Sequence, residues 1–178
     1  MKELSLLPSD HNDPVLICQA IRSRRGGRLN KLDRILLHSP VLAEGWNFFF
    51  QKLREETILP AKLREMAICV VAVINEASYE FEAHAPLLRE AGANDEQLEK
   101  IHKVGTAKFE PECFSSIERD VIKLTVQITK DIKVSKVLKD RLLIELDERQ
   151  LVELIAISSS YNLVSRFLVA TDVISEET

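Results

Sequence analysis

Glycine and proline are scarce: the sequence of 178 residues contains 5 glycines and 6 prolines. Turn-rich all-β folds, collagen-like chains and low-complexity segments need many more of both, so this scarcity argues against all three classes. Hydrophobic residues make up 46% of the chain and charged residues 29%, which excludes disorder over most of its length. We therefore expect a single domain, residues 1–178, with a sizeable core.

Cysteine is rare as well, and its placement excludes the usual uses of clustered thiols. The three cysteines, Cys18, Cys69 and Cys113, are far apart, and no CxxC motif occurs. Scattered cysteines in odd number predict neither a disulfide framework nor a cysteine-based zinc site. We expect reduced thiols that pack as small apolar side chains, and we expect no metal site and no cofactor.

The chain also lacks an excess of positive charge, a long hydrophobic run and an apolar N-terminal segment. Its formal net charge is −4, and the basic cluster at 22–28 is too short to indicate a nucleic-acid-binding protein. The longest uncharged stretch, 154–165, falls short of a membrane span. Residues 1–13 turn acidic early and contain no apolar core of signal-peptide length. We therefore expect a cytoplasmic protein with no nucleic-acid or membrane partner.

Helix start signals recur along the whole chain. Prolines suited to a first helical turn occur at 14, 40 and 60, and capping residues occur at 94, 115, 135 and 147. Residues 66–74 are apolar on every side, which indicates a helix buried all round. The segment VAVI at 71–74 resembles a strand, but a lone strand has no partner here. The sequence therefore predicts an all-α fold.

Glu65 stands at the entry to this buried helix and is the first candidate for chemistry. Ile68, Cys69 and Ala72 follow it at helical spacing, so its face of the helix continues into apolar core. A carboxylate that is partly desolvated has a pKa closer to the range useful for proton transfer. The alternative is an ordinary glutamate of a first helical turn, stabilised by the helix dipole or by a neighbouring cation.

Glu80 and His84 are four residues apart and share one helix face, where they can hydrogen-bond and tune each other. Tyr79 and Phe81 flank Glu80 and are candidates for the wall of a small pocket. Such a pair can act as general acid and base. It is a poor metal site, because HExxH-type spacing is absent and no third ligand is evident. The alternative is a surface ion pair.

Asn162 and Arg166 share one face of the last predicted helix, beside several serines. In the functional interpretation, Arg166 holds a substrate carboxylate by a fork of hydrogen bonds. In the alternative, the small serines let helices approach closely, and the arginine lies at a contact within the chain or between subunits.

Three blocks carry a family resemblance: residues 21–50, residues 63–92, which contain SYEFEAH at 78–84, and residues 158–173. Together they resemble the carboxymuconolactone decarboxylase-like family, which includes the alkylhydroperoxidase D-like (AhpD-like) proteins. The likeness covers a core from about residue 20 to 173. It implies an all-helical AhpD-like bundle of about seven to eight helices that assembles as a homo-oligomer, with its site near subunit contacts.

The peroxidase branch of this family uses a glutamate, a CxxC pair and a histidine four residues after the second cysteine. Glu65 and His84 match the glutamate and the histidine, whereas Ala77 and Glu80 stand at the cysteine positions. A thiol peroxidase needs a thiolate nucleophile and a resolving partner, and alanine and glutamate supply neither. Cys69 is the one remaining candidate thiol near this motif.

The resemblance favours a cofactor-free acid–base enzyme, a decarboxylase-like lyase, acting on a small carboxylated lactone or related carbonyl compound. In this hypothesis His84 donates a proton, Glu80 orients His84 and Glu65 relays protons. The expected substrate-binding residues are Arg166, Tyr79, Trp46 and Asn162. A second hypothesis is an alkylhydroperoxidase or peroxiredoxin-type antioxidant activity that relies on Cys69. A third is an oligomer that binds a ligand without turnover.

Overall fold

The computed structural model describes residues 4–173, which contain nine helices and no strand. This confirms the prediction of an all-α fold. The number exceeds the expected seven to eight. Two of the helices, α2 (Lys31–Leu36) and α6 (Asp95–Ile101), are short and have their own capping boxes. The chain divides after Thr57 into two compact units.

Unit 1 contains α1 (Val15–Arg24), α2 and α3 (Pro40–Glu55). Both α1 and α2 pack against α3, which begins as predicted with a proline in its first turn. Trp46 of α3 is buried in the core of this unit and stacks on Phe50, with ring centroids 5.0 Å apart. The core of unit 1 is thus organised around the inner face of α3.

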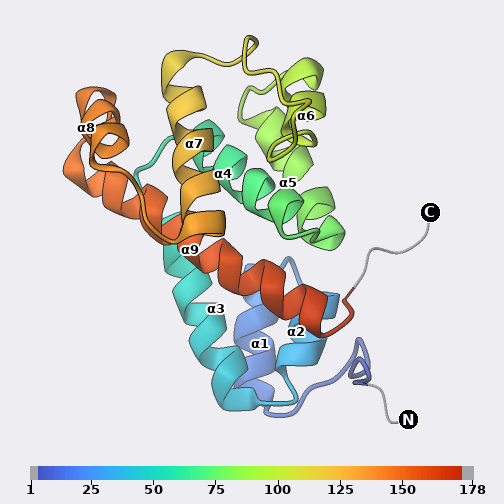
Figure 1. The fold of residues 1–178 in the computed structure, drawn as a ribbon. Coiled ribbons are helices and arrows are strands. Elements are labelled where there is room, and N and C mark those ends of the chain that lie inside the picture. The colour runs from blue at the N-terminus through green and yellow to red at the C-terminus, as the bar shows by residue number, and fades with distance from the viewer. Residues whose placement is uncertain (1–3, 174–178) are drawn as a thin grey trace. The chain divides into compact units, whose positions relative to one another are not determined.

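Unit 2 contains the other six helices: α4 (Ala61–Ile74), α5 (Ser78–Glu90), α6, α7 (Ser116–Asp131), α8 (Lys136–Glu145) and α9 (Glu148–Ala170). The central element is α4, which packs against α5, α7 and α9 (Figure 1). Within the stretch 66–74 that the apolar pattern predicts to be buried, residues 66–72 are all buried and the last two residues of α4 are partly exposed. Side chains of α4 therefore face other helices of unit 2 on nearly every side.

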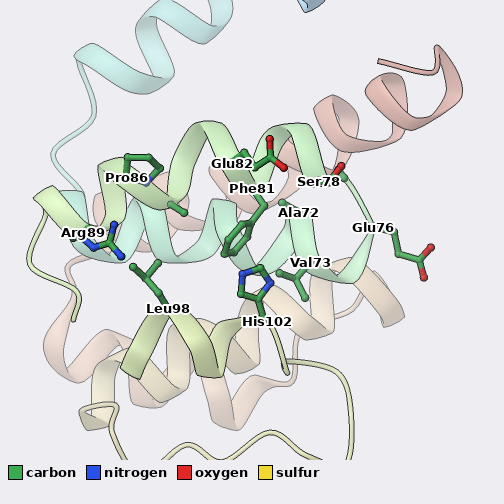
Figure 2. Close-up of a pocket in the computed structure, with 12 residues that line it drawn as sticks. Ala72, Val73, Glu76, Ser78, Phe81, Glu82, Pro86, Arg89, Leu98 and His102 are labelled. Carbon is green, nitrogen blue, oxygen red and sulfur yellow. The ribbon is translucent and has the colours of Figure 1, made fainter. Parts of the chain in front are cut away.

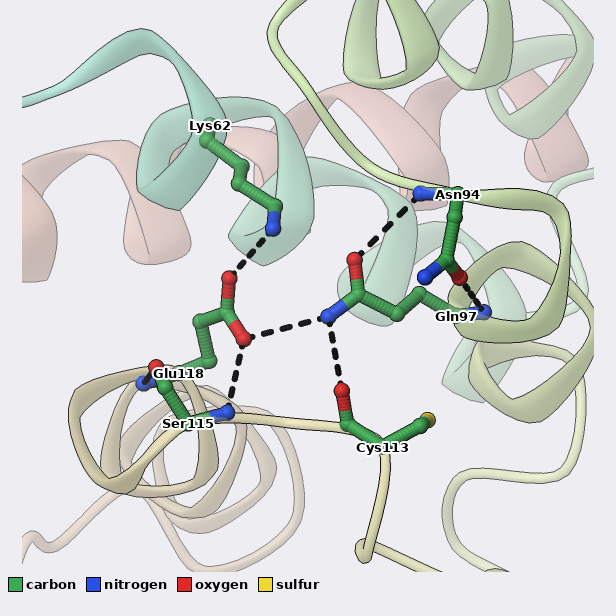
Figure 3. Close-up of polar contacts among 6 residues, drawn as sticks. All are labelled: Lys62, Asn94, Gln97, Cys113, Ser115 and Glu118. Atoms are coloured by element: carbon green, nitrogen blue, oxygen red, sulfur yellow. Dashed lines mark hydrogen bonds and ion pairs between the residues drawn. The ribbon is translucent and has the colours of Figure 1, made fainter.

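A buried carboxylate joins the N-terminal ends of α4, α6 and α7. Glu118 Oε2 accepts hydrogen bonds from the backbone nitrogen of Ser115, at 2.8 Å, and from Nε2 of Gln97, at 3.1 Å (Figure 3). Lys62 Nζ lies 2.6 Å from Glu118 Oε1. Burial raises the pKa of Glu118, but the bonds from Lys62 and Ser115 outweigh it and leave the pKa below its ordinary value. The predicted capping box of α7 therefore also holds α4 and α6 in place.

By length and composition alone, α9 meets the criteria for a membrane span, with a mean hydropathy of 1.2 over an 18-residue window. Half of that window is buried inside the protein, where α9 packs against α4, α7 and α8. The core helix of a globular unit meets the same criteria, so they are weak evidence. Four of its buried residues are polar, namely Ser158, Ser160, Asn162 and Ser165.

Candidate functional site

Three ionisable side chains meet between α4 and α5. His84 Nδ1 lies 2.6 Å from Glu65 Oε2, and His84 Nε2 lies 3.0 Å from Glu80 Oε1. The exposed fractions are 2% for Glu65, 6% for Glu80 and 3% for His84. We call this cluster the Glu–His–Glu triad. It brings together the three residues that the sequence singles out for acid–base chemistry.

Local structure explains how the triad forms. Glu80 and His84 lie one turn apart on α5, and Glu80 is in the first turn, where the helix dipole favours a carboxylate. Glu65 reaches them from α4, because α4 and α5 pack closely along their lengths. The burial of Glu80 and His84 rules out the alternative of a surface ion pair.

A cationic side chain, Arg64, contacts the triad at Glu65. Arg64 Nε is 3.1 Å from Glu65 Oε1, the oxygen that does not contact His84. Positive and negative groups therefore alternate from Arg64 through Glu65 and a protonated His84 to Glu80. Pairing with a neighbouring cation was the alternative for Glu65, and the structure shows that it coexists with the bond to histidine. Arg64 is the member of the site that the sequence reasoning did not select.

The surroundings of His84 favour its charged form. Burial lowers the pKa of the imidazole, but the hydrogen bonds to Glu65 and Glu80, with the charges of both carboxylates, outweigh burial and raise the pKa above 6.5. The edge of the ring contacts Tyr161, with centroids 5.1 Å apart and planes at 84°. The ring is thus held in one orientation with both nitrogens facing carboxylates.

This arrangement suits proton transfer and not metal binding. Both nitrogens of His84 are engaged by carboxylates, so neither is left to ligate a metal ion. Within residues 4–173, no group of three or more histidine, cysteine or acidic side chains is arranged to hold a metal. A proton, by contrast, can pass between Glu65 and Glu80 through the two nitrogens of the ring.

Cys69 lies one turn after Glu65 on α4 and is fully buried. Burial raises the pKa of its thiol well above the ordinary value, and the charges of Glu65 and Glu80 raise it further. The nucleophile of a thiol peroxidase is the thiolate, which this environment disfavours. The position of Cys69 therefore speaks against the antioxidant hypothesis.

Asn162 is engaged in packing between helices. Its Nδ2 donates to Thr129 Oγ1 at 3.0 Å and to the carbonyl oxygen of Ser158 at 2.9 Å. Its Oδ1 accepts a bond of 2.9 Å from Nδ2 of Asn75. These bonds tie α9 to α7 and to the end of α4, and they favour the packing alternative over substrate binding.

The other predicted substrate-binding residues lie in three different places. Arg166 is exposed on α9 and forms no ion pair within the part of the chain that the structure describes. Tyr79 is partly exposed beside Glu80 at the start of α5. Trp46 lies in the core of unit 1. The bonds that form the triad come from α4 and α5 alone.

A pocket of about 830 Å³ opens on the opposite face of α5 from the triad, between α5, α6 and the end of α4 (Figure 2). Phe81 lines it and Tyr79 does not, whereas the sequence led us to expect both at a pocket beside Glu80. The lining residues of α5 recur at helical spacing, which is the signal in the sequence that indicates a common face. They include Ser78, Glu82, Ala85 and Arg89.

Comparison with protein families identifies the region that contains the triad. Residues 40–110 match the model of the Carboxymuconolactone decarboxylase family. This stretch includes Glu65, Glu80 and His84, and the match confirms the resemblance predicted from the sequence. No curated protein matches the chain.

Solved structures share the fold over nearly the whole chain. An uncharacterized peroxidase-related protein from Silicibacter sp. TM1040 superposes with a TM-score of 0.75 at 15% identity, covering 96% of this chain and 88% of its own. A cysteine-to-alanine variant of the debrominase Bmp8, in complex with 2,3,4-tribromopyrrole, has a TM-score of 0.76 at 16% identity and covers 97% and 90%. Ligand-free Bmp8 gives 0.74 at 16% identity, covering 95% and 89%. At such identities the likeness establishes the fold, which is the predicted AhpD-like one.

Proposed function

We propose, for a chain whose residues 40–110 match the carboxymuconolactone decarboxylase family, a cofactor-free acid–base activity on a small carboxylated lactone or a related carbonyl compound. The observation that carries this proposal is the placement of His84 between Glu65, at 2.6 Å, and Glu80, at 3.0 Å. A buried, protonated imidazole that is hydrogen-bonded to two carboxylates can donate a proton to either of them.

Decarboxylation beside a carbonyl leaves an electron pair on carbon, which is stabilised as an enolate until a proton arrives. We assign the final transfer to Glu80, because the Nε2 proton of His84 already points at this carboxylate and not at open space. His84 protonates Glu80, Glu80 protonates the substrate carbon, and Glu65 holds the ring with the support of Arg64. The balance is one carboxylate substrate and one proton giving carbon dioxide and the protonated product.

The division of roles differs from the expectation drawn from the sequence, in which His84 donates directly, Glu80 orients it and Glu65 relays protons. With both nitrogens bonded to carboxylates, the imidazole is the middle of the relay and Glu80 is its end. A general acid of this kind contributes about 10²–10⁴-fold to a rate. The substitutions His84→Gln and Glu80→Gln are expected to lower turnover within that range.

The test is carbon dioxide release from 4-carboxymuconolactone by the purified protein and by the variant His84→Gln. The matched control is His38→Gln, because His38 is an exposed histidine of unit 1. Release that the control retains and His84→Gln loses supports the proposal. If His84→Gln retains full turnover, His84 does not take part in the reaction as proposed. If the unchanged protein releases no carbon dioxide, this lactone is not its substrate.

One observation favours the alternative of a ligand-binding protein without turnover. The triad is almost closed to solvent, since Glu80, its most exposed member, is only 6% exposed. An enzyme must admit substrate to Glu80 by a movement of α5 or its neighbours, whereas a structural ion-pair cluster needs no access. Solvent exchange of the labile ring protons of His84, followed by NMR, distinguishes the enzyme from the ligand-binding protein. Exchange that accelerates when substrate is added supports the proposal of an enzyme.

We also propose that the protein assembles as a homo-oligomer. On α3, Phe48 is 64% exposed and Phe49 is 45% exposed, and Val41 is 82% exposed. Clustered apolar side chains of this size on a helix surface are typical of protein interfaces. Light scattering coupled to gel filtration gives the subunit number, and Phe48→Glu is expected to lower it. A monomer in the unchanged protein contradicts this proposal.

A further inference from the structure

The pocket between α5 and α6 has the size and lining of a ligand site. Its volume of about 830 Å³ falls within the range of roughly 300–1,000 Å³ typical of small-molecule pockets. Its floor is apolar, with side chains from α4, α5 and α6 that include Ala72, Val73, Ala85 and Leu98. An apolar floor of this extent suits the body of a small hydrophobic molecule.

This pocket is separate from the triad. On α5 its lining residues Ser78, Glu82 and Ala85 lie on one face, whereas Glu80 and His84 lie on the opposite face. None of the three triad residues lines the pocket. The inference that follows is therefore independent of the proposed acid–base function.

An aromatic platform lies in the middle of the pocket. The rings of Phe81 and His102 are in contact, with centroids 4.0 Å apart and planes at 44° (Figure 2). Phe81 comes from α5 and is buried, while His102 follows α6 and is exposed. Planar ligands stack on such surfaces, and the face of an aromatic ring also attracts a cation.

The charges at the rim of the pocket are unequal. The side chains of Glu76 and Glu82 are exposed, and their carboxylates form no ion pair or hydrogen bond with other residues in the range 4–173. The charge of Arg89, the one arginine of the rim, is already paired, because its Nε and Nη2 atoms donate to Asp95 Oδ1 at 3.0 and 2.6 Å. The open charge of the rim is therefore negative.

The two kinds of charge are also separated in space. Figure 2 shows Glu76 and Arg89 at opposite ends of the pocket, with Phe81 and His102 between them. Glu82 lies close to Phe81, between these two ends. A ligand that lies along the pocket would thus place a cationic group on the side of Glu82 and Glu76 and its apolar end toward Leu98 and the Arg89 end. A carboxylate ligand would meet two unpaired carboxylates instead.

We propose that this pocket is a second binding site, for a small apolar or aromatic molecule that carries a protonated amine. The platform of Phe81 and His102 receives the ring, the apolar floor receives the hydrocarbon, and the exposed carboxylates of Glu82 and Glu76 attract the ammonium group. Shape selects the size of the molecule, and the unpaired carboxylates select its charge.

The first test compares three probes of nearly equal size on the unchanged full chain: 2-phenylethylamine, 2-phenylethanol and 3-phenylpropanoate. Binding is followed by chemical-shift changes in a ¹⁵N-labelled protein. We expect the amine to bind most tightly and the carboxylate least, with shifts in residues of α5 and α6. Equal binding of all three, tighter binding of the carboxylate, or no binding of the amine at millimolar concentration overturns the proposal.

The second test uses a matched pair of variants on α5. Glu82→Gln removes a rim carboxylate, while Glu90→Gln removes an exposed carboxylate of the same helix that does not line the pocket. An exposed charge pair contributes little, so we expect Glu82→Gln to weaken amine binding by about two- to fivefold and to leave 2-phenylethanol unchanged. Amine affinity that is unaltered in Glu82→Gln, or lowered equally in Glu90→Gln, refutes the assignment of the ammonium group.

A third variant tests the floor. Ala85 is partly exposed and lines the pocket, so Ala85→Phe fills the space without removing a buried side chain. We expect this variant to lose binding of both the amine and the alcohol while retaining the helical circular dichroism of the unchanged protein. A folded Ala85→Phe that still binds both probes shows that they bind elsewhere and refutes the site.

Discussion

His84 Nδ1 lies 2.6 Å from Glu65 Oε2, across two helices and 19 positions of the sequence. This bond joins the start of the buried helix α4 to the middle of α5, and the second nitrogen of the same ring faces Glu80. A histidine enclosed in this way cannot be altered without leaving two buried carboxylates close together. The chemistry and the stability of unit 2 therefore depend on the same side chain.

The stability of the protein is expected to depend on the charge of His84. Because the folded state raises its pKa above 6.5, the imidazolium adds stability that is fully present below that pH and is lost as the pH rises through the folded pKa. His84→Gln should cost about 3–5 kcal/mol at about pH 6 and less at about pH 9. Urea unfolding at both pH values measures the difference.

The control for this experiment is His38→Gln, which alters an exposed histidine. It should change the free energy of unfolding by less than about 0.5 kcal/mol at either pH. A cost for His84→Gln that grows with pH contradicts the raised pKa.

The two carboxylates of the triad are expected to raise the pKa of His84 by separate amounts. The hydrogen bond that the ring donates to Glu65 raises the pKa more than the one it donates to Glu80, while the charge of Glu80 raises it more than the charge of Glu65 does. Glu65→Gln and Glu80→Gln should therefore each lower the pKa of His84, because each change removes a negative charge beside a buried imidazolium. Titration of the ring nitrogens by NMR gives the pKa in each variant.

Glu44→Gln provides the comparison, since Glu44 is exposed on α3 and lies outside unit 2. It should leave the pKa of His84 unaltered. If Glu65→Gln leaves this pKa in place as well, the 2.6 Å contact is not an ionic hydrogen bond.

The thiols are expected to differ in reactivity in the order of their exposure. Cys113 is partly exposed, whereas Cys18 and Cys69 are fully buried. Burial also raises the pKa of Cys69, so its thiolate is scarce at neutral pH. Limited alkylation or mild peroxide, followed by mass spectrometry, should modify Cys113 first. Modification of Cys69 ahead of Cys113 would restore the thiol peroxidase hypothesis.

The network around Glu118 is expected to stabilise unit 2 above acid pH. The folded state lowers the pKa of Glu118 below its ordinary value of 4.5. The ionised carboxylate therefore stabilises the protein fully above about that pH, and this stabilisation is lost as the pH falls through the folded pKa. Glu118→Gln breaks the contact with Lys62 and should cost about 1–3 kcal/mol at neutral pH, and less in acid. Thermal unfolding at several pH values checks this, with Glu44→Gln as the exposed control. If the loss of stability in Glu118→Gln is as large in acid as at neutral pH, the ionised carboxylate is not its cause.

Much of the fold could be predicted because its signals are local. The capping boxes that begin α6, α7 and α9 are formed by residues three apart, and the structure has a cap at Asn94, Ser115 and Asp147 where the sequence predicts one. The burial of residues 66–72 follows from their apolar pattern alone. The number of helices was harder to predict, because α2 has only six residues and too few turns for a clear periodicity.

The site was predicted only in part. Glu80 and His84 were paired by their spacing of four, and Glu65 was selected by its place at the entry to the buried helix, while the family resemblance matched Glu65 and His84 to one site. Among the residues expected to bind substrate, Asn162 bonds to Thr129 and Asn75, and no spacing along α9 reveals those partners. The pocket also escaped prediction, because it combines α5 with Leu98 and His102, which belong to a different segment of the chain.

The sequence by itself determined the helices, their ends and the face of α5 on which Glu80 and His84 lie, since these depend on residues within one or two turns of each other. Only the tertiary structure decided that Glu65 lies 2.6 Å from His84, that Cys69 is fully buried, and that a separate pocket opens on the other face of α5. Those properties depend on how α4, α5 and α6 pack together. Helix packing arises from the complementarity of whole surfaces, which no short stretch of sequence contains.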